Sequence, residues 1–380
     1  MDFTYSEEQS AISELSHRIL SEQLPPERLR ELEQAGTWPA DDVWAALAKA
    51  DLLGIALPEA DGGGGYGLLE ACLVAEQVGR TVAPIPYLSC IVGAALPVAE
   101  FGTAEQRARL LPGVIDGTTT LTVALHEIDD VEVAALPATQ AVQAGQPGSW
   151  KITGTKQFVV GADRAAAILV PARTGEHAVT VFLVAPDAPG VSLAPEVAVT
   201  GEPQWTVHLD DVAVSAADVL GPPDEGGPVV RWLVDRLTAA ICAAQTGVCE
   251  ESLAITARYV CEREQFGTKL GTFQAVGHRI ADAYIDTEAI RLTALQAIWR
   301  LDRGLDATDE LMVAKFFAAE GAQRVVHAAQ HLHGGIGVDL DYPIHRYFRW
   351  AKVLELTLGG ASPCLVRLGA SLANQPVEMV

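Results

Sequence analysis

The sequence predicts an α+β fold in which two helical regions flank a central block of β-strands. From residue 6 to about 118, apolar residues recur at three- and four-residue intervals, which is the helical period. From about 119 to 222 they form short runs rich in Val, Ile, Thr and Leu, and from 228 to about 373 the helical period returns. We therefore predict three domains: a helical domain (1–118), a β domain (119–222) and a helical domain (223–380).

The first helical region contains one glycine-rich break. Amphipathic patterns occupy residues 7–20 and 41–57, and the run from Gly62 to Gly65 follows them. A run of four glycines is more often a flexible surface turn than a phosphate loop, and no predicted strand precedes this one. We therefore assign no nucleotide to it.

The second and third regions contain the longest regular patterns. Runs such as 150–160, 165–173 and 178–185 predict an antiparallel, barrel-like β domain because Gly, Pro and Asp separate them. The blocks 228–264 and 274–302 are long and apolar over much of their circumference. They predict helices that pack against one another as a four-helix bundle.

Composition and charge exclude several classes of partner. The chain has 26 Lys and Arg against 49 Asp and Glu, a formal charge of −23, so its surface should repel nucleic acid phosphates and acidic lipid headgroups. Its first residues lack the basic flank of a signal peptide, and its longest apolar runs are too short to span a bilayer. Six cysteines without a C-x-x-C pair indicate reduced core residues. We predict a cytoplasmic protein without nucleic acid or membrane partners.

The segment from Tyr259 to Asp282, YVCEREQFGTKLGTFQAVGHRIAD, is the most informative stretch. Taken alone, Arg263 between two glutamates is an exposed helix residue that makes local ion pairs. The whole string, however, resembles the acyl-CoA dehydrogenase family, whose C-terminal domain carries R-x-Q-F-G followed by F-Q-A and an Ala-Asp pair. Other family features follow in order: F-x-x-[ST]-x-E-Q at 3–9, L-L-G-I-A-L-P-E at 52–59, F-G-T-x-E-Q at 101–106, V-x-V-x-x-x-x-V-L-G at 212–221 and H-G-G-I-G at 333–337.

The resemblance implies contacts with the ADP half of an FAD that a neighbouring subunit holds. A guanidinium gives paired hydrogen bonds to a pyrophosphate, and a phenyl ring offers a flat apolar face. In a second family segment, Q-x-x-G-G-x-G, His331 stands here in place of the Gln, and the glycines keep the close approach of the backbone. The residues that the resemblance implies are Arg263, Gln265, Phe266, Leu270, Gln274, His331, Gly334 and Gly335.

The histidines of this second segment raise the question of a metal site. His327 and His331 have the i, i+4 spacing of a ligand pair, but no Glu lies between them as in H-E-x-x-H, and no third ligand is evident. Hydrogen bonding within helix packing accounts for His327, His331 and His333, so we predict no metal.

The positions at which the family carries its catalytic base hold leucines in this chain. The family removes an α proton and a β hydride from an acyl-CoA thioester, which requires a buried carboxylate of raised pKa. Most members carry it as the Glu of an E-G-T triplet after R-x-A-K, and alignment through residues 349–352 places Leu358 there. Other members carry it on the helix before R-x-Q-F-G, at the position of Leu237. We therefore predict that the chain has no catalytic base.

The contacts that the family makes with the flavin ring are altered as well. Where the family has T-E-P-x-x-G-S-D, this chain reads VALHEIDDVE at 123–132. The family's W-I-T/S becomes Phe158-Val159-Val160, which keeps an aromatic ring and loses the hydroxyl. Concurrent losses in one ring-and-substrate site indicate a degenerate redox pocket beside surviving ADP contacts.

This asymmetry resembles the noncatalytic chain of the heteromeric acyl-CoA dehydrogenases that bacteria use on steroid side chains. The resemblance implies a second family subunit as partner, in a heterotetramer. It also implies an acyl-CoA substrate, with a steroid or other bulky acyl group, and electron-transfer flavoprotein as the electron acceptor.

Three alternative functions remain open at this point. The first is a self-sufficient dehydrogenase whose base has moved to Asp235 or Glu355, although a solvated helix face also explains Asp235. The second is a flavin monooxygenase on the same scaffold, which needs no carboxylate base. The third is a structural protein without flavin, which the retained R-x-Q-F-G makes the weakest.

Overall fold

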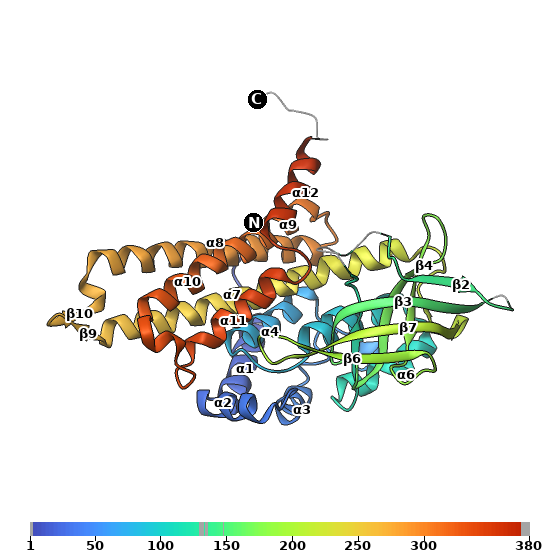
Figure 1. Ribbon diagram of the computed structural model, residues 1–380, viewed down its shortest axis with the longest axis horizontal. Coiled ribbons are helices and arrows are strands. Elements are labelled where there is room, and N and C mark those ends of the chain that lie inside the picture. Colours follow the sequence, from blue (N-terminus) through green and yellow to red (C-terminus); the bar gives the residue numbers. More distant parts are fainter. Residues whose placement is uncertain (1–2, 129–132, 134–135, 147, 374–380) are drawn as a thin grey trace. The chain divides into compact units, whose positions relative to one another are not determined.

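A computed structural model of the chain describes residues 3–128, 133, 136–146 and 148–373 (Figure 1). The chain forms two compact units, which we call the helical unit (1–36, 72–83 and 238–380) and the sheet unit (37–71 and 84–237). The predicted α+β class, with helices before and after a sheet, is confirmed. The outermost residues of the first and third predicted domains, and 129–132 of the altered stretch 123–132, lie outside the described residues.

The helical unit is built from long helices that run side by side (Figure 1). Ser6 caps the start of helix α1: its hydroxyl accepts from the backbone N–H of Gln9, and the Gln9 side chain accepts from the backbone N–H of Ser6. The other helices of this unit form where apolar residues recur at the helical period in the sequence. The helices that lie wholly in this unit are α1 (Glu7–Gln23), α2 (Pro26–Ala35), α8 (Gln274–Asp302), α9 (Thr308–Phe316), α10 (Ala322–His333), α11 (Ile344–Leu356) and α12 (Ala361–Ala373), with short helices η4 (Leu270–Thr272), η5 (Phe317–Gly321) and η6 (Gly334–Val338) and strands β9 (Glu264–Gln265) and β10 (Thr268–Lys269).

Two helices contribute to both units. The division between units falls within α4 (Leu68–Arg80) and within α7 (Gly226–Glu262). In the helical unit these two helices meet backbone to backbone, because a Cβ on Gly79 would lie 1.9 Å from the Ala244 carbonyl oxygen. Only glycine permits so close a crossing.

The sheet unit holds one eight-stranded sheet with helices. The strand order is β6-β7-β3-β2-β4-β5-β8, and β1 pairs with β4 outside this path. The strands are β1 (Thr120–Val123), β2 (Gln140–Gln143), β3 (Ser149–Val160), β4 (Ala165–Arg173), β5 (Val179–Val184), β6 (Val191–Val197), β7 (Pro203–Ser215) and β8 (Val219–Leu220), and the helices are α3 (Asp41–Lys49), α5 (Leu96–Phe101), α6 (Ala104–Ile115), η1 (Glu59–Asp61), η2 (Tyr87–Ala95) and η3 (Ala216–Asp218).

The prediction of a purely antiparallel sheet is wrong in two places. Strand β4 pairs in parallel with β1 and, at Gln140 and Arg173, with β2, whereas the other pairings of the sheet are antiparallel. Side chains alternate with the same period of two in both kinds of strand, so periodicity does not reveal strand direction.

Strands of the sheet unit share a hydrophobic core. Trp150 and Ile152 on β3, Phe182 on β5 and Val207 on β7 are buried there, and the rings of Trp150 and Phe182 meet edge to face at 5.7 Å. Alternate residues of β3 and β7 therefore point inward. Burial of such large apolar side chains contributes about 1.5–3 kcal/mol each and fixes the register of the strands.

The glycine run is a turn, as predicted, but a tightly packed one. The backbone N–H of Gly64 donates to the carbonyl of Gly54, and that of Gly65 donates to the carbonyl of Leu57. A Cβ on Gly63 would lie 2.3 Å from the Leu57 carbonyl oxygen. The glycines therefore permit a close backbone contact.

The cysteines and the apolar helices were also the subject of sequence predictions. All six cysteines are free, and five are buried. Cys261 is exposed, so its assignment to the core is wrong; it lies near the end of α7, where the helix leaves the packed part of its unit. No helix among the described residues has both the length and the apolar character that a membrane crossing requires.

Candidate functional site

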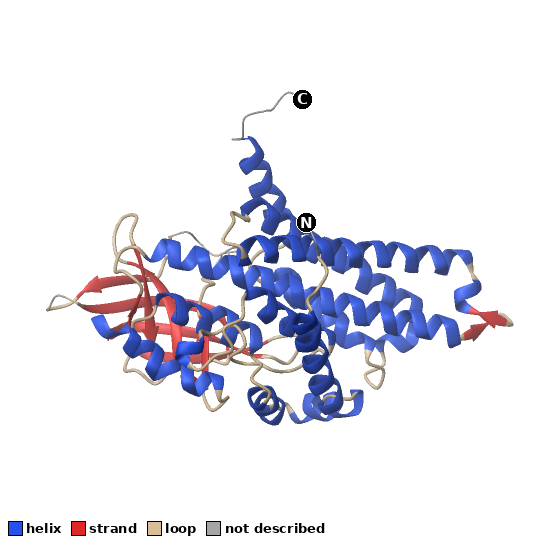
Figure 2. Ribbon diagram, turned by 180° about the vertical axis from the view of Figure 1, so that it is seen from behind, coloured by secondary structure: helices blue, strands red, loops and turns tan. Residues whose placement is uncertain are grey.

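The R-x-Q-F-G segment forms a small β-hairpin at the end of α7. Strands β9 and β10 are antiparallel, with Gln265 opposite Thr268. Between them Phe266 and Gly267 both have positive φ, 55° and 77°, which is the backbone of a tight two-residue hairpin turn. Figure 2 shows this strand pair between the end of α7 and the start of α8.

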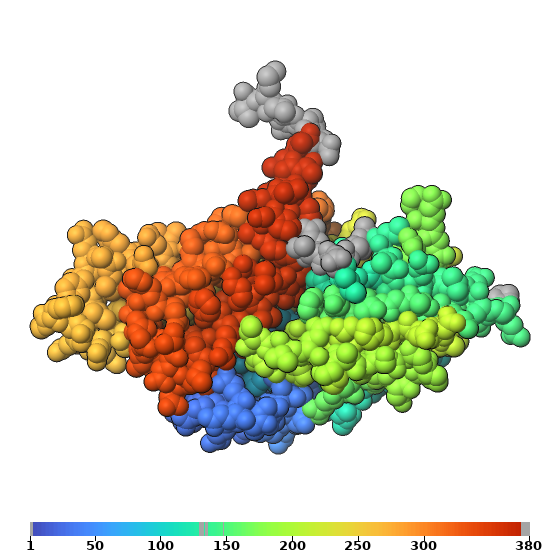
Figure 3. Space-filling view, in the orientation of Figure 1, coloured from blue at the N-terminus to red at the C-terminus, as the bar shows by residue number. Residues whose placement is uncertain are grey.

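The turn holds an aromatic side chain out into solvent. Phe266 is 93% exposed, and its ring lies 6.4 Å from that of Phe273, which precedes α8. In Figure 3 the hairpin lies within the gold surface at the left edge of the view. A large apolar ring in a non-glycine αL position, without cover, is typical of a surface that binds a partner or ligand.

Three cations of this segment lack an ion-pair partner among the described residues. Arg263, Lys269 and Arg279 are exposed, and none forms an ion pair with any described residue. The local ion pairs expected between Arg263 and its flanking glutamates are therefore not made, although Glu262 and Glu264 are also exposed. In a chain of charge −23, three uncompensated cations within 17 positions of sequence can attract an anion.

The other predicted residues of this segment lie on the hairpin and the first turn of α8. The side chain of Gln265 donates to the Glu264 carbonyl oxygen at 2.7 Å, and the Gln274 amide lies 3.5 Å from the His278 ring. The backbone N–H of Leu270 donates to the Arg263 carbonyl oxygen, closing the hairpin. The structure thus brings the five predicted residues of this segment to one end of the helical unit.

The second predicted segment lies at the same end of that unit. Tyr259, one turn before Arg263, stacks on His333 with ring centroids 4.4 Å apart. His331 is exposed, and Gly334 takes a φ of 61°. A Cβ on Gly334 or Gly335 would meet no atom within 4 Å, so a flat ligand has access to the backbone there.

The three histidines do not form a metal centre. His333 is buried, its Nδ1 lies 2.8 Å from the Ala329 carbonyl oxygen, and burial lowers its pKa. The His327 ring lies 3.2 Å from the Gln323 amide and contacts Phe348. No group of three or more His, Cys, Asp or Glu that could hold a metal occurs within the described part of the chain.

Leucines are buried at both positions at which the resemblance places the family's base. Leu358 follows α11 with a φ of 60°, an αL conformation that costs a leucine about 1–2 kcal/mol, and it is nevertheless buried. Leu237 is buried on α7. The Lys315 ammonium holds the end of α11 by donating to the carbonyl oxygens of Leu354 and Glu355, at 2.6 and 3.1 Å.

The two proposed replacement bases lie in different surroundings. Glu355 accepts a hydrogen bond from the Lys352 ammonium at 2.6 Å, in an i, i+3 ion pair of its own helix. Asp235 is half-buried on α7, two residues before Leu237 and rotated about 200° around the helix from it.

The strand that meets the flavin ring in the family is irregular here. A bulge interrupts the pairing of β3 with β7 between Lys156 and Val159, and Phe158 in the bulge has a φ of 56° and is 52% exposed. Its ring lies 6.2 Å from that of His126. Val160 accepts a hydrogen bond from the Thr122 hydroxyl through its backbone only, so residues 158–160 offer no side-chain donor to a flavin.

Sequence reasoning missed a buried ion pair beside this bulge. The Lys156 ammonium lies 2.7 Å from a carboxylate oxygen of Glu127, and both side chains are buried. Burial alone would raise the pKa of Glu127, but the Lys156 charge and hydrogen bonds from Lys156 and Thr139 outweigh it and lower that pKa. Lys156 occupies an inward-facing position of β3, and that register was the available signal.

Comparison with known proteins now places the chain. The acyl-CoA dehydrogenase N-terminal domain matches residues 6–118, the middle domain matches 124–212 and the C-terminal domain matches 224–369. The chain therefore belongs to the acyl-CoA dehydrogenase family. Homologues that share this fold bind FAD.

Its relatives include a steroid ACAD. A solved variant of the Tcur3481-Tcur3483 steroid ACAD is 45% identical, with a TM-score of 0.89, and the match covers 97% of this chain and 98% of that one. The ChsE4-ChsE5 complex from Mycobacterium tuberculosis is 38% identical, with a TM-score of 0.91 and coverage of 99% and 100%. Acyl-CoA dehydrogenase FadE27 of the same organism is 39% identical over 99% of this chain and its own full length.

Proposed function

We propose that this chain is the noncatalytic subunit of a two-subunit acyl-CoA dehydrogenase. In this proposal it contacts the ADP half of an FAD held by a second family subunit and performs no dehydrogenation itself. The observation that carries the proposal is that Leu358 and Leu237 stand, both buried, at the family's base positions, whereas the Arg263–Phe266 hairpin is exposed and its cation is unpaired.

The hairpin and the glycine segment suit one half of the cofactor. The Arg263 guanidinium would pair with the pyrophosphate, with Gln265 and Gln274 as further donors, and Phe266 would cover an apolar edge. Leu270, His331, Gly334 and Gly335 would line the adenosine side, where no Cβ stands in the way at either glycine. When bound, FAD supplies hydride acceptance from the β carbon of the acyl group.

The region of this chain that corresponds to a flavin-ring site does not suit the flavin half of FAD. Phe158 projects at a bulge beside His126, and residues 158–160 carry no hydroxyl. A flavin ring needs hydrogen-bond donors that tune its electronics as well as a flat cover. We therefore assign only ADP contacts to this chain.

A second family subunit is the partner that we propose, in a heterotetramer. Helix α8, which follows the hairpin, exposes Tyr284, Ile285 and Leu292, and these apolar side chains continue along the helix from the Phe266 surface. Exposed apolar area beside a ligand contact is typical of a subunit interface. The Tcur3481-Tcur3483 steroid ACAD supports a steroid or other bulky acyl-CoA as substrate. A similar solved structure, named as an electron transferring flavoprotein, supports electron-transfer flavoprotein as acceptor.

We expect the chain expressed alone to be flavin-poor and inactive toward acyl-CoA thioesters. Coexpression with a family subunit encoded beside it should give a yellow, active complex. In that complex Arg263→Ala should lower the flavin content or raise the dissociation constant for FAD by tenfold or more, because a charge-assisted pair contributes about 1.5–3 kcal/mol. The measurements are the flavin-to-protein absorbance ratio and FAD titration.

Arg303→Ala is the matched control, because Arg303 is an exposed arginine without an ion pair to any described residue at the other end of α8. It should leave flavin content unchanged. A purified homomer with one FAD per chain and acyl-CoA turnover would contradict the proposal.

The relocated-base alternative makes the opposite prediction for two amide variants. We expect Asp235→Asn and Glu355→Gln to leave turnover of the complex within about twofold of the unmodified complex, because neither carboxylate takes the proton in our proposal. Loss of a hundredfold or more in either variant, which is the range of a general base, would favour a relocated base. Oxygen uptake by the reduced complex without dehydrogenation would favour a monooxygenase.

A further inference from the structure

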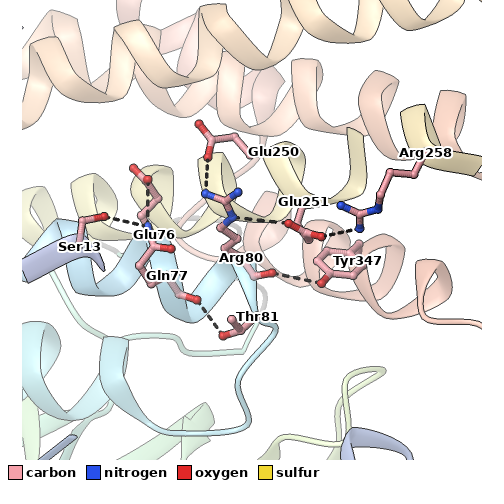
Figure 4. Close-up of polar contacts among 9 residues, drawn as sticks. All are labelled: Ser13, Glu76, Gln77, Arg80, Thr81, Glu250, Glu251, Arg258 and Tyr347. Carbon is pink, nitrogen blue, oxygen red and sulfur yellow. Dashed lines mark hydrogen bonds and ion pairs between the residues drawn. The ribbon is translucent and has the colours of Figure 1, made fainter. Parts of the chain in front are cut away.

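The crossing of α4 and α7 fixes two carboxylates near each other in the helical unit. A Cβ on Gly247 would lie 1.9 Å from the Glu76 carbonyl oxygen, so the helix backbones are in contact at that residue. Glu76 projects from α4 beside this contact, and Glu250 follows Gly247 by one turn of α7 (Figure 4). The two side chains cannot separate by a shift of the helices without breaking the crossing.

The charges around this crossing do not balance. Arg258 pairs with Glu251 at 3.1 Å, Arg291 pairs with Glu288 at 2.6 Å, and Arg80 lies 3.7 Å from Glu250 and 3.5 Å from Glu251. These three guanidiniums face four carboxylates, Glu76 being the fourth. One positive charge is therefore lacking in a partly buried site, where an uncompensated charge is costly.

Glu76 is the carboxylate without a cation of its own. Its side chain accepts a hydrogen bond from the Gln77 amide at 3.3 Å, and that amide also donates to the Ser13 hydroxyl of α1 (Figure 4). Burial raises the pKa of Glu76 and Glu250 adds to the rise, while Arg80 and Arg291 oppose it. Burial also raises the pKa of Glu250.

The remaining groups that face the pair are neutral or already balanced. The phenol of Tyr5 comes from the segment before α1, and its pKa is raised by burial and then by Glu76. The thiols of Cys72 and Cys249 are buried in α4 and α7. Asp286 on α8 pairs with Arg324. None of these groups supplies the missing positive charge.

We propose that Glu76 and Glu250 share one proton at neutral pH and that this proton holds the N-terminal segment and α1 against the α4–α7 crossing. Loss of the proton places two anions side by side under the cover that Tyr5 and Ser13 provide. The pair then requires water, which enters most readily where α1 covers it. Packing of α1 is thus stabilised only while the pair is protonated.

The direction of the pH dependence follows from the raised pKa. The pKa of a glutamate in the unfolded chain is about 4.3, whereas the folded pair loses its shared proton at higher pH. Between these two values the folded state binds more protons than the unfolded state, so stability falls as pH rises through this window and levels off above it. Below the lower value the contribution of the proton is fully present.

The test uses the isosteric variant Glu76→Gln in the full chain. We expect it to raise the melting temperature at mildly alkaline pH, to flatten the fall of stability from acid to alkaline pH, and to remove a protonated-carboxyl band from the infrared spectrum at neutral pH. At one fixed alkaline pH the amides of α1 should exchange more slowly than in the wild type. Glu250→Gln, which leaves Arg80 to neutralise Glu76, should flatten the same profile.

Glu310→Gln is the control, because Glu310 pairs with Arg300 at 3.3 Å and is not one of the four carboxylates at the crossing. It should keep the alkaline fall of stability and the infrared band. A Glu76→Gln variant whose stability parallels that of the wild type at every pH, or whose infrared band persists, would overturn the proposal.

Discussion

Gly79→Ala is expected to destabilise the helical unit by at least about 3 kcal/mol, a loss at the upper end of those caused by overpacking. The added Cβ would lie 1.9 Å from the Ala244 carbonyl oxygen, well inside the closest approach of two atoms. The obstructing atom belongs to the backbone of α7, so no side-chain rotation relieves the clash and the helices must move apart. Chemical denaturation followed by far-ultraviolet circular dichroism measures the loss.

Gly369→Ala in α12 is the matched control. A Cβ at Gly369 meets no atom within 4 Å, and this glycine is also helical. Alanine there should be neutral or stabilise by up to about 1 kcal/mol, since alanine is the better helix former. Equal denaturation midpoints for Gly79→Ala and the wild type would show that the crossing is not close-packed.

The fold was predictable from sequence because its elements are long and regular. The two long blocks at 228–264 and 274–302 became α7 and α8 with ends within a few residues of those expected. Strand direction was not predictable, because the parallel pairing of β1 with β4 joins segments more than 40 residues apart and leaves no local pattern. The crossing of α4 and α7 was also hidden, since Gly79 and Gly247 look like ordinary weak points of two helices.

The proposed site was also only partly predictable from the sequence. Resemblance identified the hairpin residues, but their exposure and the unpaired state of Arg263 required coordinates. The sequence itself showed leucines at 358 and 237, where the family has a carboxylate. It did not show that the side chains of Lys156 and Lys315 are fully buried, because lysine is normally exposed. Hydrophobic periodicity treats a lysine as a surface residue and therefore misses such positions.

Lys156→Met is expected to destabilise the sheet unit by about 3–5 kcal/mol, because it leaves the Glu127 carboxylate buried without its cation. The Glu127 carboxylate still accepts from the backbone N–H of Thr139, at 2.9 Å, and so cannot move out to water without breaking this contact. Lys151→Met on the same strand is the control: Lys151 pairs with Asp211 at 3.0 Å on the surface, and its loss should cost at most about 1 kcal/mol.

The pH dependence of the Lys156→Met variant distinguishes a lost charge pair from lost packing. In the wild type the pKa of Glu127 is lowered, so its contribution to stability is present above the ordinary carboxylate range and disappears as pH falls through the folded value. In the variant, burial without a cation should raise this pKa, so acidification protonates Glu127 and removes the cost. The two stability curves should therefore converge toward acid pH. A difference that stays constant with pH would mean that the methylene chain of Lys156, and not its charge, supports the strand that carries Phe158.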